Sequence, residues 1–358
     1  MSRIIAHLDM DAFFAAIEER DTPAFRGVPL VVGADPHGGK GRGVASTSNY
    51  LARAYGIHSA TPISTAWRLS EAARRSGKPP VTFVSVDMPK YGRVSEEVMR
   101  IVRRFIAKVE QASIDEVYGD LSGMESYEEA ERICRRLKEA IVSEVRLTAS
   151  VGIGPNKLIA KIASGWQKPD GLMVVREEEV EAFLSPLSVR VIPGIGPKTE
   201  ALLREKEIRI VKDLRDASLQ QLTHLLGKRG AAFYDKARGH DDSPVEEYSE
   251  PQSIGEQETF ESDTLDSHTL FTQLDSLARG VMDRLTLEGF KAFRTVVLTV
   301  RFADFETKSR AHTLAVPSND RGVLKREGIK LLMPFLDRRE NPHRKRIRLL
   351  GVRLEKLM

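Results

Sequence analysis

Residues 4–11 read Ile-Ile-Ala-His-Leu-Asp-Met-Asp, an apolar run that ends in acidic side chains. A second acidic stretch comes much later, where Ser113-Ile114 leads into Asp115-Glu116. Short apolar runs of this kind are typical of buried strands, so we expect Asp9, Asp115 and Glu116 to meet where two strands run out. Carboxylates without a histidine or cysteine ligand make an all-oxygen site, which suits a hard cation such as Mg²⁺. A two-metal phosphoryl-transfer enzyme needs that arrangement.

Each of these carboxylates alone could equally be a helix cap or an ordinary surface charge. The neighbours Asp115 and Glu116 are harder to explain in that way, because like charges side by side on a strand repel each other unless a cation neutralises them. We therefore interpret Asp9, Asp115 and Glu116 as a candidate metal site and keep the surface interpretation as the alternative.

The composition is that of an ordinary globular chain. Its 358 residues are 41% hydrophobic and 30% charged, a length that suits roughly two to four domains. The 55 basic and 51 acidic residues give a net charge of +4, which hints only weakly at nucleic acid. The single Cys134 excludes a disulfide framework and fits a reducing compartment. No apolar run approaches the roughly 18 residues of a membrane span and the N-terminus is no signal peptide, so we expect a cytoplasmic protein.

Hydrophobic periodicity and turn residues predict alternating strands and helices in the first half of the chain. In order these are strand 3–9, helix 12–20 with Asp11 as its N-cap, strand 29–33, strand 43–47, helix 49–55, a helix with an apolar stripe from Val94 to Val109, strand 113–121, a helix around Cys134, strand 147–153 and a basic helix 155–164. Such alternation implies a sheet covered by helices.

The second half of the chain predicts a different organisation. Short helices without a clear strand are expected over 177–240, and the polar, acidic, Pro-containing stretch 241–252 is expected to be a tether. A last domain is expected to contain helix 265–288, strands 293–303 and 308–316, helix 319–337 and strand 346–355.

Ile192-Pro-Gly-Ile-Gly-Pro-Lys198 is the second informative motif. Gly194 and Gly196 permit a tight turn, and Pro197 suits the first position of a helix. A helix N-terminus with exposed amides binds phosphate, so this stretch is typical of a helix-hairpin-helix element that holds the DNA backbone without reading its sequence. An ordinary helix–helix turn is the alternative.

Basic side chains elsewhere suggest phosphate contacts. Tyr50 and Arg53 lie one helical turn apart after a Gly-rich loop, and Lys168 lies in Gln-Lys-Pro-Asp-Gly. Near metal-bound carboxylates, such cations would neutralise a triphosphate. The cluster 343–348 opens the last expected strand, and the neighbouring strands carry Arg294, Arg301, Lys308 and Arg310. A basic sheet face of this kind would follow a phosphate backbone, although solvated surface charge is the alternative for each of these residues.

The chain resembles the Y-family translesion DNA polymerases, in particular the DNA polymerase IV branch, over essentially its whole length. The segments that carry the resemblance are Asp-Met-Asp-Ala-Phe-Phe-Ala (9–15), Ser-Thr-Ser-Asn-Tyr-Leu-Ala-Arg (46–53), Ala-Ser-Ile-Asp-Glu-Val-Tyr (112–118), Ser-Val-Gly-Ile-Gly-Pro-Asn-Lys (150–157), Gln-Lys-Pro-Asp-Gly (167–171) and Pro-Gly-Ile-Gly (193–196). Their number and order make the resemblance specific.

The resemblance implies a multi-domain α/β (α+β) architecture of the right-hand polymerase type. The expected parts are a catalytic palm over 1–12 and 76–175, fingers over 13–75, a helical thumb with the helix-hairpin-helix over 176–240, the linker 241–252 and a β-α little finger that binds DNA over 253–358. The expected activity is error-prone, damage-tolerant DNA synthesis on a primer–template from deoxynucleoside triphosphates, without proofreading.

Site roles also follow from the resemblance. Asp9, Asp115, Glu116 and the Met10 carbonyl would hold two Mg²⁺ ions, with Mn²⁺ able to substitute. The residues expected at the nucleotide and at DNA are the sugar gate Phe14, the triphosphate contacts Thr47, Tyr50, Arg53 and Lys168, the roof over the template base formed by Ala34, Val44, Ser46 and Ala60, and the DNA-backbone contacts Gly194, Gly196, Lys198, Arg344 and Arg346.

The chain departs from the family pattern at two places. Val117-Tyr-Gly-Asp120 stands where the family usually has Ala-Tyr-Leu-Asp, and we expect Gly119 to soften that strand. The chain ends Leu354-Glu-Lys-Leu-Met358 without the usual sliding-clamp peptide, which puts clamp binding by the tail in doubt. We expect a monomer without membrane contact.

Two other classes of protein remain possible at this point. A catalytically dead polymerase scaffold would keep the DNA-binding domains and lose the carboxylates, all of which are present. A non-enzymatic helix-hairpin-helix DNA-binding protein would not need Tyr50, Arg53 and Lys168. A primer-extension assay with Mg²⁺ and all four nucleotides distinguishes these classes from a polymerase.

Overall fold

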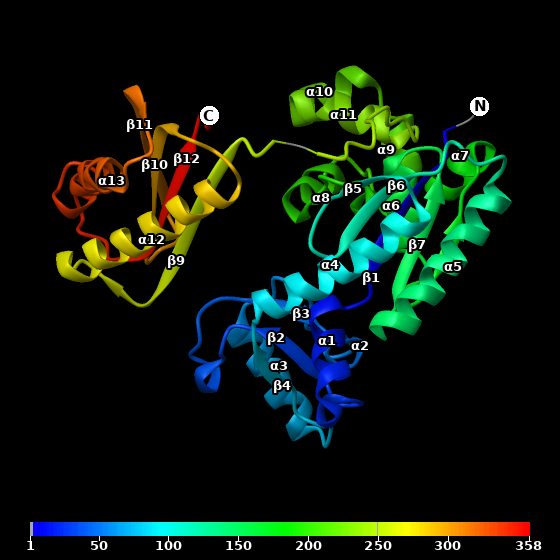
Figure 1. The fold of residues 1–358 in the computed structure, drawn as a ribbon, viewed down its shortest axis with the longest axis horizontal. Helices are drawn as coiled ribbons and strands as arrows, with labels where there is room; N and C mark the ends of the chain where they lie inside the picture. Colours follow the sequence, from blue (N-terminus) through cyan, green and yellow to red (C-terminus); the bar gives the residue numbers. More distant parts are fainter. Residues whose placement is uncertain (1–2, 249) are drawn as a thin grey trace. The chain divides into compact units, whose positions relative to one another are not determined.

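The computed structural model describes residues 3–248 and 250–358, and the chain divides into two compact units after Tyr248. The first unit contains two sheets and the second unit one (Figure 1). Each unit also has its own hydrophobic core. In the described part of the chain, no helix is both long enough and apolar enough to cross a membrane.

The first unit is built on a five-stranded sheet with the order β5-β6-β1-β7-β8. Its strands are β1 (Ile5–Met10), β5 (Lys108–Gln111), β6 (Glu116–Asp120), β7 (Ala149–Gly154) and β8 (Leu172–Val174). Strand β1 lies in the middle and runs antiparallel to both β6 and β7. The predicted meeting of the two acidic stretches is confirmed, because Asp9 lies directly opposite Glu116. The acidic pair stands at the start of β6, however, and the antiparallel pairing brings that start to the end of β1.

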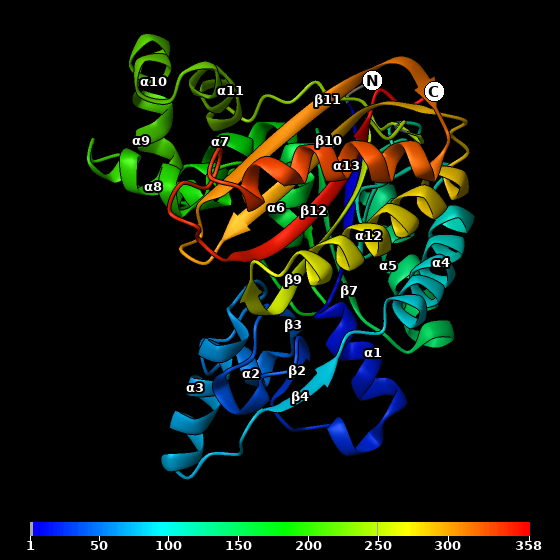
Figure 2. The same ribbon diagram turned by 90° about the vertical axis from the view of Figure 1, so that its left-hand side faces the viewer.

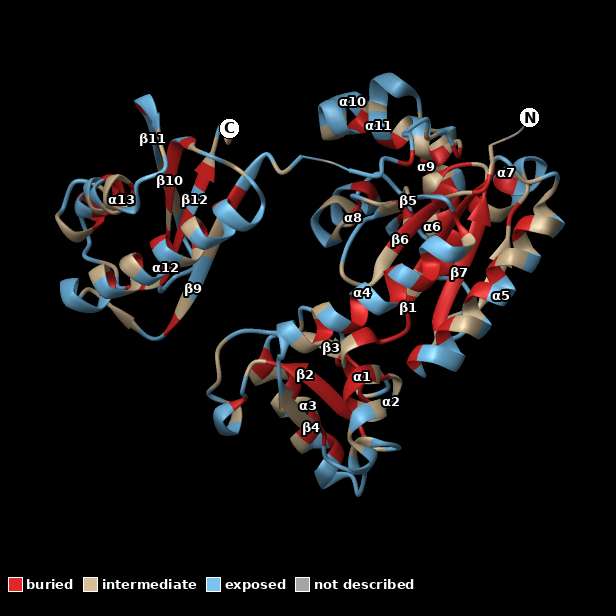
Figure 3. Ribbon diagram, in the orientation of Figure 1, coloured by how far each residue is buried: buried red, intermediate tan, exposed pale blue. Residues whose placement is uncertain are grey.

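Helices cover both faces of this sheet. Helices α4 (Met88–Phe105) and α5 (Tyr127–Val145) pack on one face, against the side chains of Leu8 and its alternate neighbours in β1. Ala160 of α6 (Lys157–Ser164) packs on the other face with Ile5 and Tyr118. Because side chains alternate along a strand, Ile5, His7 and Asp9 all point to the α6 face. Figure 3 shows β7 buried along its length between these layers.

Three local predictions for this unit need correction or comment. The helix with the Val94 stripe ends at Phe105, so Val109 belongs to strand β5. Asp11 does not cap the next helix, since α1 (Phe13–Asp21) has Ala12 at its N-cap and no side-chain cap. Gly119 does not interrupt β6, which pairs with β1 and β5 through that residue. A Cβ at Gly119 would lie 2.8 Å from Ile106, so the glycine makes room for that side chain.

The first unit contains a second sheet of three strands, with the order β3-β2-β4. Its strands are β2 (Leu30–Gly33), β3 (Ala45–Ser48) and β4 (Thr82–Ser85), accompanied by α2 (Tyr50–Arg53) and α3 (Ile63–Arg75). Strand β4 pairs with β2 in parallel, so this sheet extends past position 76. The sequence analysis predicted neither α3 nor β4. Strand β4 is short and its first three residues are only half-buried. Helix α3 buries Ile63, Ala66 and Ala73 at helical spacing, a local signal that the sequence analysis missed.

Five short helices follow and share one hydrophobic core, as the turn-rich sequence predicts. They are α7 (Val180–Leu184), α8 (Pro197–Arg204), α9 (Val211–Asp216), α10 (Leu219–Leu226) and α11 (Lys228–Ala237). The chain then continues along the first unit. The Leu158 amide donates to Asp241 over 3.0 Å, and Val245 is buried with Ile5 and Tyr118. The predicted tether over 241–252 is therefore wrong for 241–246, which packs against the first unit through these contacts.

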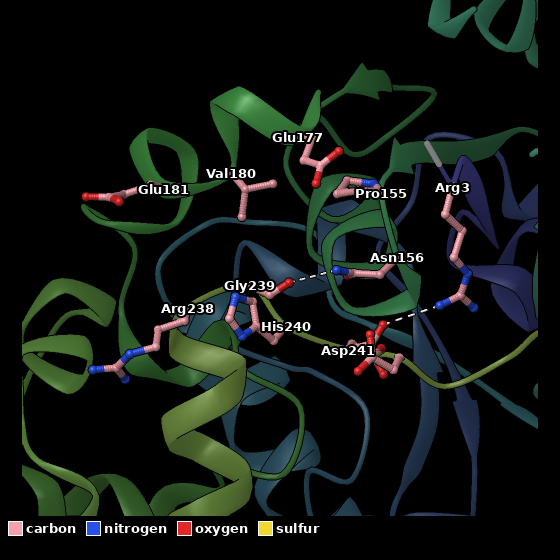
Figure 4. Close-up of a pocket in the computed structure, with 11 residues that line it drawn as sticks. Arg3, Pro155, Asn156, Glu177, Val180, Glu181, Arg238, Gly239, His240 and Asp241 are labelled. Carbon is pink, nitrogen blue, oxygen red and sulfur yellow. Dashed lines mark hydrogen bonds between the residues drawn. The ribbon is translucent and has the colours of Figure 1, made fainter. Parts of the chain in front are cut away.

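A pocket of about 530 Å³ lies beside the beginning of this packed stretch (Figure 4). Asn156 donates to the Gly239 carbonyl over 2.7 Å and Arg3 to the Asp241 carbonyl over 3.4 Å. Glu177, Glu181, Asp241 and Asp242 give the pocket a strongly acidic lining beside its arginines. None of the residues predicted for the nucleotide or metal site lines it.

The second unit is a four-stranded antiparallel sheet with the order β11-β10-β12-β9. Its elements are β9 (Ser253–Thr264), α12 (Ser267–Leu287), β10 (Phe293–Phe302), β11 (Thr307–Ser318), α13 (Arg321–Leu336) and β12 (Ile347–Glu355). Helices α12 and α13 lie side by side on one face of the sheet (Figure 2). The sequence analysis missed β9, because only Ile254 and Phe260 are buried in a strand that otherwise reads as polar linker.

Candidate active site

The Asp9–Glu116 pair is the centre of the candidate site. Asp9 is the penultimate residue of β1, Glu116 opens β6, and their side chains retain exposures of 19% and 26%. Asp115 precedes β6, where its carbonyl accepts a hydrogen bond from the Met10 amide over 3.0 Å. Backbone pairing therefore places Asp9, Met10, Asp115 and Glu116 at one end of the sheet.

Two lysines neutralise the Asp9–Glu116 pair. Lys168 forms an ion pair with Asp9, and Lys161 of α6 lies 2.7 Å from Glu116 Oε2. Burial raises the pKa of Asp9 to about 6, although Lys168 pulls that pKa downward. His7, followed by Lys161, holds the pKa of Glu116 well below its ordinary range. A positive charge beside each carboxylate therefore offsets the cost of removing it from water.

The donor chemistry fits hard divalent cations. Within the described ranges, no group of three acidic, histidine or cysteine side chains is already arranged as a metal cage. The side chains of Asp9, Glu116 and Asp115 nevertheless offer only oxygen, and the first two face each other across paired strands. Oxygen ligands are those preferred by Mg²⁺ and similar ions. Lys161 and Lys168 neutralise the carboxylates that such ions would bind.

His7 is a feature of the site that the sequence analysis missed. It is fully buried, with Nδ1 2.8 Å from Ser164 Oγ and Nε2 3.8 Å from Glu116 Oε2. Nε2 has no hydrogen-bond partner, and burial lowers the pKa of the ring. The alternation of side chains along the strand could have revealed this position. Residues two apart in a strand share a face, and His7 lies two residues before Asp9.

The residues predicted to contact phosphate come from three segments of the first unit, namely α2, β3 and the turn before β8. Asn49 caps α2 by accepting from the Ala52 amide over 2.9 Å, and this short helix carries Tyr50 and Arg53. The Arg53 guanidinium lies 4.6 Å from the centre of the Tyr50 ring, a cation–π contact. Burial raises the pKa of Tyr50 to about 12. Thr47 lies half-buried on β3, and Lys168 reaches the same region from the turn before β8.

Phe14 lies half-buried on the first turn of α1 and stacks on Tyr91 of α4. The ring centres are 4.3 Å apart and the planes are inclined by 13°. The Tyr91 hydroxyl donates to the buried Glu18 over 2.8 Å. The ring of Phe14 is thus supported from behind by a fixed aromatic neighbour.

The four small residues predicted to form the roof gather around β3. The Ala34 amide donates to the Val44 carbonyl over 3.2 Å, and the Ala60 amide to the Ala45 carbonyl over 2.8 Å. Ser46 lies half-buried between these connections, while Val44 and Ala60 are exposed. The structure therefore brings Ala34, Val44, Ser46 and Ala60 to one end of the three-stranded sheet.

The turn before α8 has the geometry that its glycines predict. Gly194 has a φ of 101°, a left-handed conformation that favours glycine. Gly196 is the N-cap of α8, Pro197 is its first residue, and Lys198 is exposed on its first turn. The amides at this helix start can therefore donate hydrogen bonds to a phosphate.

The prediction that the basic residues of the second unit share one sheet face is wrong. Lys308 and Arg310 pair with Val300 and Leu298, whose side chains belong to the helix-covered core. Cross-strand partners share a face, so both basic residues lie on that side, where they bind Glu340. Arg301 alternates to the opposite face. Arg344 and Arg346 are exposed in the turn before β12, and the strand itself begins at Ile347.

The fold and the site define a nucleotidyl-transferring DNA polymerase built from palm, fingers and thumb. The impB/mucB/samB family model matches residues 8–165, and that family's C-terminal domain matches 251–358. The thumb-domain model of DNA polymerase iota matches residues 190–241. The chain belongs to this family, the Y-family of translesion DNA polymerases.

Curated relatives and solved structures agree with this assignment. DNA polymerase IV 2 of Methanosarcina mazei is 44% identical over 99% of this chain and 92% of its own length. DNA polymerase IV of Methanoculleus marisnigri is 42% identical over 99% and 95%. A Y-family chimera, Dbh-Dpo4(243-245)-Dbh, superposes with a TM-score of 0.85 at 27% identity, covering 99% of both chains. An insertion ternary complex of Dbh DNA polymerase reaches a TM-score of 0.68 at 27% identity, again over 99% of both chains.

Proposed function

We propose that this chain extends a DNA primer on a template by nucleotidyl transfer at the Asp9–Glu116 end of the five-stranded sheet. The observation that carries the proposal is the direct register of Asp9 with Glu116, each ion-paired with a lysine. Asp9, Asp115, Glu116 and the Met10 carbonyl would hold two Mg²⁺ ions, with Mn²⁺ as a substitute. When bound, such ions lower the pKa of the primer 3′-hydroxyl and neutralise the triphosphate.

The protein's own contribution is to bind and orient the substrate. Tyr50 and Arg53 from α2 and Lys168 from the turn before β8 bind the triphosphate, and Thr47 of β3 adds a hydroxyl. Their distribution over three segments supports this role, because groups held on separate segments can fix the orientation of the bound phosphates. Positioning and charge stabilisation supply most of the catalysis in phosphoryl transfer.

DNA is held by phosphate contacts away from the carboxylates. The turn at Gly194, Gly196 and Lys198 and the exposed Arg344 and Arg346 supply these contacts. We also infer that one chain is sufficient, because the carboxylates, the triphosphate contacts and the thumb hairpin belong to its first unit, and Arg344 and Arg346 belong to its second unit.

Primer extension with Mg²⁺ and all four deoxynucleotides tests the proposal. We expect template-directed extension of an annealed primer and no shortening of a mismatched 3′ end. A protein that binds the duplex and leaves the primer unextended would be one of the two non-catalytic alternatives.

The small roof predicts a specific effect of enlarging Ser46. Ala34, Val44, Ser46 and Ala60 leave space around the nascent base pair, so shape selection is weak and a modified template base can enter. Ser46→Phe is expected to reduce bypass of a bulky template adduct by about tenfold more than copying of an undamaged template. Single-nucleotide insertion on matched damaged and undamaged templates measures this ratio. Ala72→Phe, at an exposed position of α3, is the control; equal losses on both templates would contradict the roof role.

Arg344 and Arg346 provide a test of DNA binding by the second unit. Each phosphate contact contributes about 0.9 to the slope of log K against log salt. The double variant Arg344→Ala/Arg346→Ala is therefore expected to lower that slope by about two. It should weaken binding to all DNA sequences by the same factor. Arg310→Ala removes the same charge from a side chain that is already paired with Glu340, so its slope should stay near that of the unchanged protein. A sequence-dependent loss would argue against backbone binding.

A further inference from the structure

Asp11 is a buried carboxylate for which the mechanism above has no role. Its exposure is 3%, and it does not cap the helix that follows it. A buried carboxylate is costly unless hydrogen bonds compensate for the lost water. The partners of Asp11 therefore indicate what it does.

Those partners come from three separate elements. Ser150 Oγ on β7 donates to Asp11 Oδ1 over 2.8 Å, and the Asp170 amide donates to Oδ2 over 2.8 Å. The Tyr50 hydroxyl on α2 lies 3.5 Å from Oδ1. Ser150 Oγ also accepts from the Gly171 amide over 3.2 Å. Both oxygens of Asp11 are thus engaged, and two hydrogen bonds hold the turn that follows Lys168.

The backbone around Asp11 is held equally firmly. The Asp11 amide donates to the Thr148 carbonyl over 3.0 Å. The next residue, Ala12, has φ 45° and ψ 44°, a left-handed conformation that is unfavourable for a residue with a side chain. Such a conformation persists only where the surrounding structure holds it in place. The hydrogen bonds of Asp11 hold the backbone at Ala12.

We propose that Asp11 is a positioning residue that fixes the separation between Tyr50 and Lys168, and thereby the affinity of the site for the triphosphate. Tyr50 and Lys168 come from different elements, and Asp11 bonds to the hydroxyl of the first and to the turn that carries the second. Asp11 acts through these two residues and not on the reacting atoms. The inference rests on the proposed triphosphate role of Tyr50 and Lys168.

Single-nucleotide insertion kinetics with Asp11→Ala, Tyr50→Phe and the double variant test the proposal. Asp11→Ala is expected to raise the KM for the nucleotide about tenfold, the effect of one lost hydrogen bond to a charged group, with unchanged affinity for primer–template. Since Asp11 acts partly through Tyr50, the double variant should raise KM by less than the product of the single effects. The dissociation constant of the nucleotide on a dideoxy-terminated primer should follow the same pattern.

Two milder variants distinguish a positioning effect from loss of folding. Asp11→Asn keeps the volume and one acceptor, and Ser150→Ala removes a single partner, so both should raise KM by a smaller factor. Ser70→Ala loses a comparable buried hydrogen bond, from the Val81 amide, outside the nucleotide region and should leave KM unchanged. Melting temperatures of all variants report the purely structural effect.

The outcomes separate this inference from the function on which it depends. If Lys168→Ala raises KM while Asp11→Ala, Asp11→Asn and Ser150→Ala do not, or if the effects of Asp11→Ala and Tyr50→Phe multiply, the positioning role of Asp11 is overturned and the triphosphate site stands. If Tyr50→Phe and Lys168→Ala both leave KM unchanged, the triphosphate site fails and the role of Asp11 fails with it.

Discussion

Asp9→Ala is expected to abolish primer extension, lowering kcat at least about a thousandfold. Bound metal ions supply several kcal/mol of charge stabilisation in the transition state, and each 1.36 kcal/mol is a factor of ten in rate. Asp9 is half-buried beside Glu116 at the end of β1, so its loss would remove one of the oxygen ligands proposed for the metals. Extension rates under single-turnover conditions measure the effect, and Asp115→Ala is expected to behave in the same way.

Affinity for DNA separates this effect from unfolding. The proposed DNA contacts belong to the thumb hairpin and the second unit and do not include Asp9, so Asp9→Ala should bind primer–template with nearly unchanged affinity. Asp120→Ala is the matched control, because Asp120 is an acidic residue on β6 that pairs opposite Ile5, on the same face as Asp9. It should retain extension. Near-normal extension by Asp9→Ala would show that the carboxylates do not hold the metals.

Phe14→Ala is expected to let ribonucleotides into the site, raising their kcat/KM relative to deoxynucleotides by about a hundredfold. Phe14 stands on the first turn of α1 with its ring flat against Tyr91, so it cannot swing back to admit a 2′-hydroxyl. Removing the ring opens that space. Insertion kinetics with paired ribo- and deoxynucleotides on one template measure the discrimination.

Ring volume, and not polarity, should decide the outcome at Phe14. Phe14→Tyr keeps the ring and is expected to keep the discrimination, whereas Phe14→Ala should lose it and retain deoxynucleotide insertion. A Phe14→Ala variant that still rejects ribonucleotides would place the sugar gate at another residue.

The elements that sequence reasoning located best are those whose pattern is local. The long helices α4, α5 and α12, the turn at Gly194 and the strands β1 and β10 each show their own apolar period or turn chemistry. The strands β4 and β9, which it missed, are stabilised by partners far away in the chain. Strand β9 buries only two side chains and is held by pairing with β12, and β4 is held by pairing with β2.

The sequence by itself determined which chemical groups the site can use. The acidic stretches at positions 9 and 115–116, the small roof residues and the Gly-Pro turn before Lys198 are local choices, and they indicate oxygen ligands, space at the template base and phosphate binding wherever the chain folds. Only the tertiary structure decided which groups share a face. Strand register placed His7 beneath Glu116 and moved Lys308 and Arg310 away from Arg301. Packing placed Asp11 between Tyr50 and Asp170. The physical reason is that strand register and packing depend on partners far apart in the chain, and a shift of one residue turns every side chain of a strand to the opposite face.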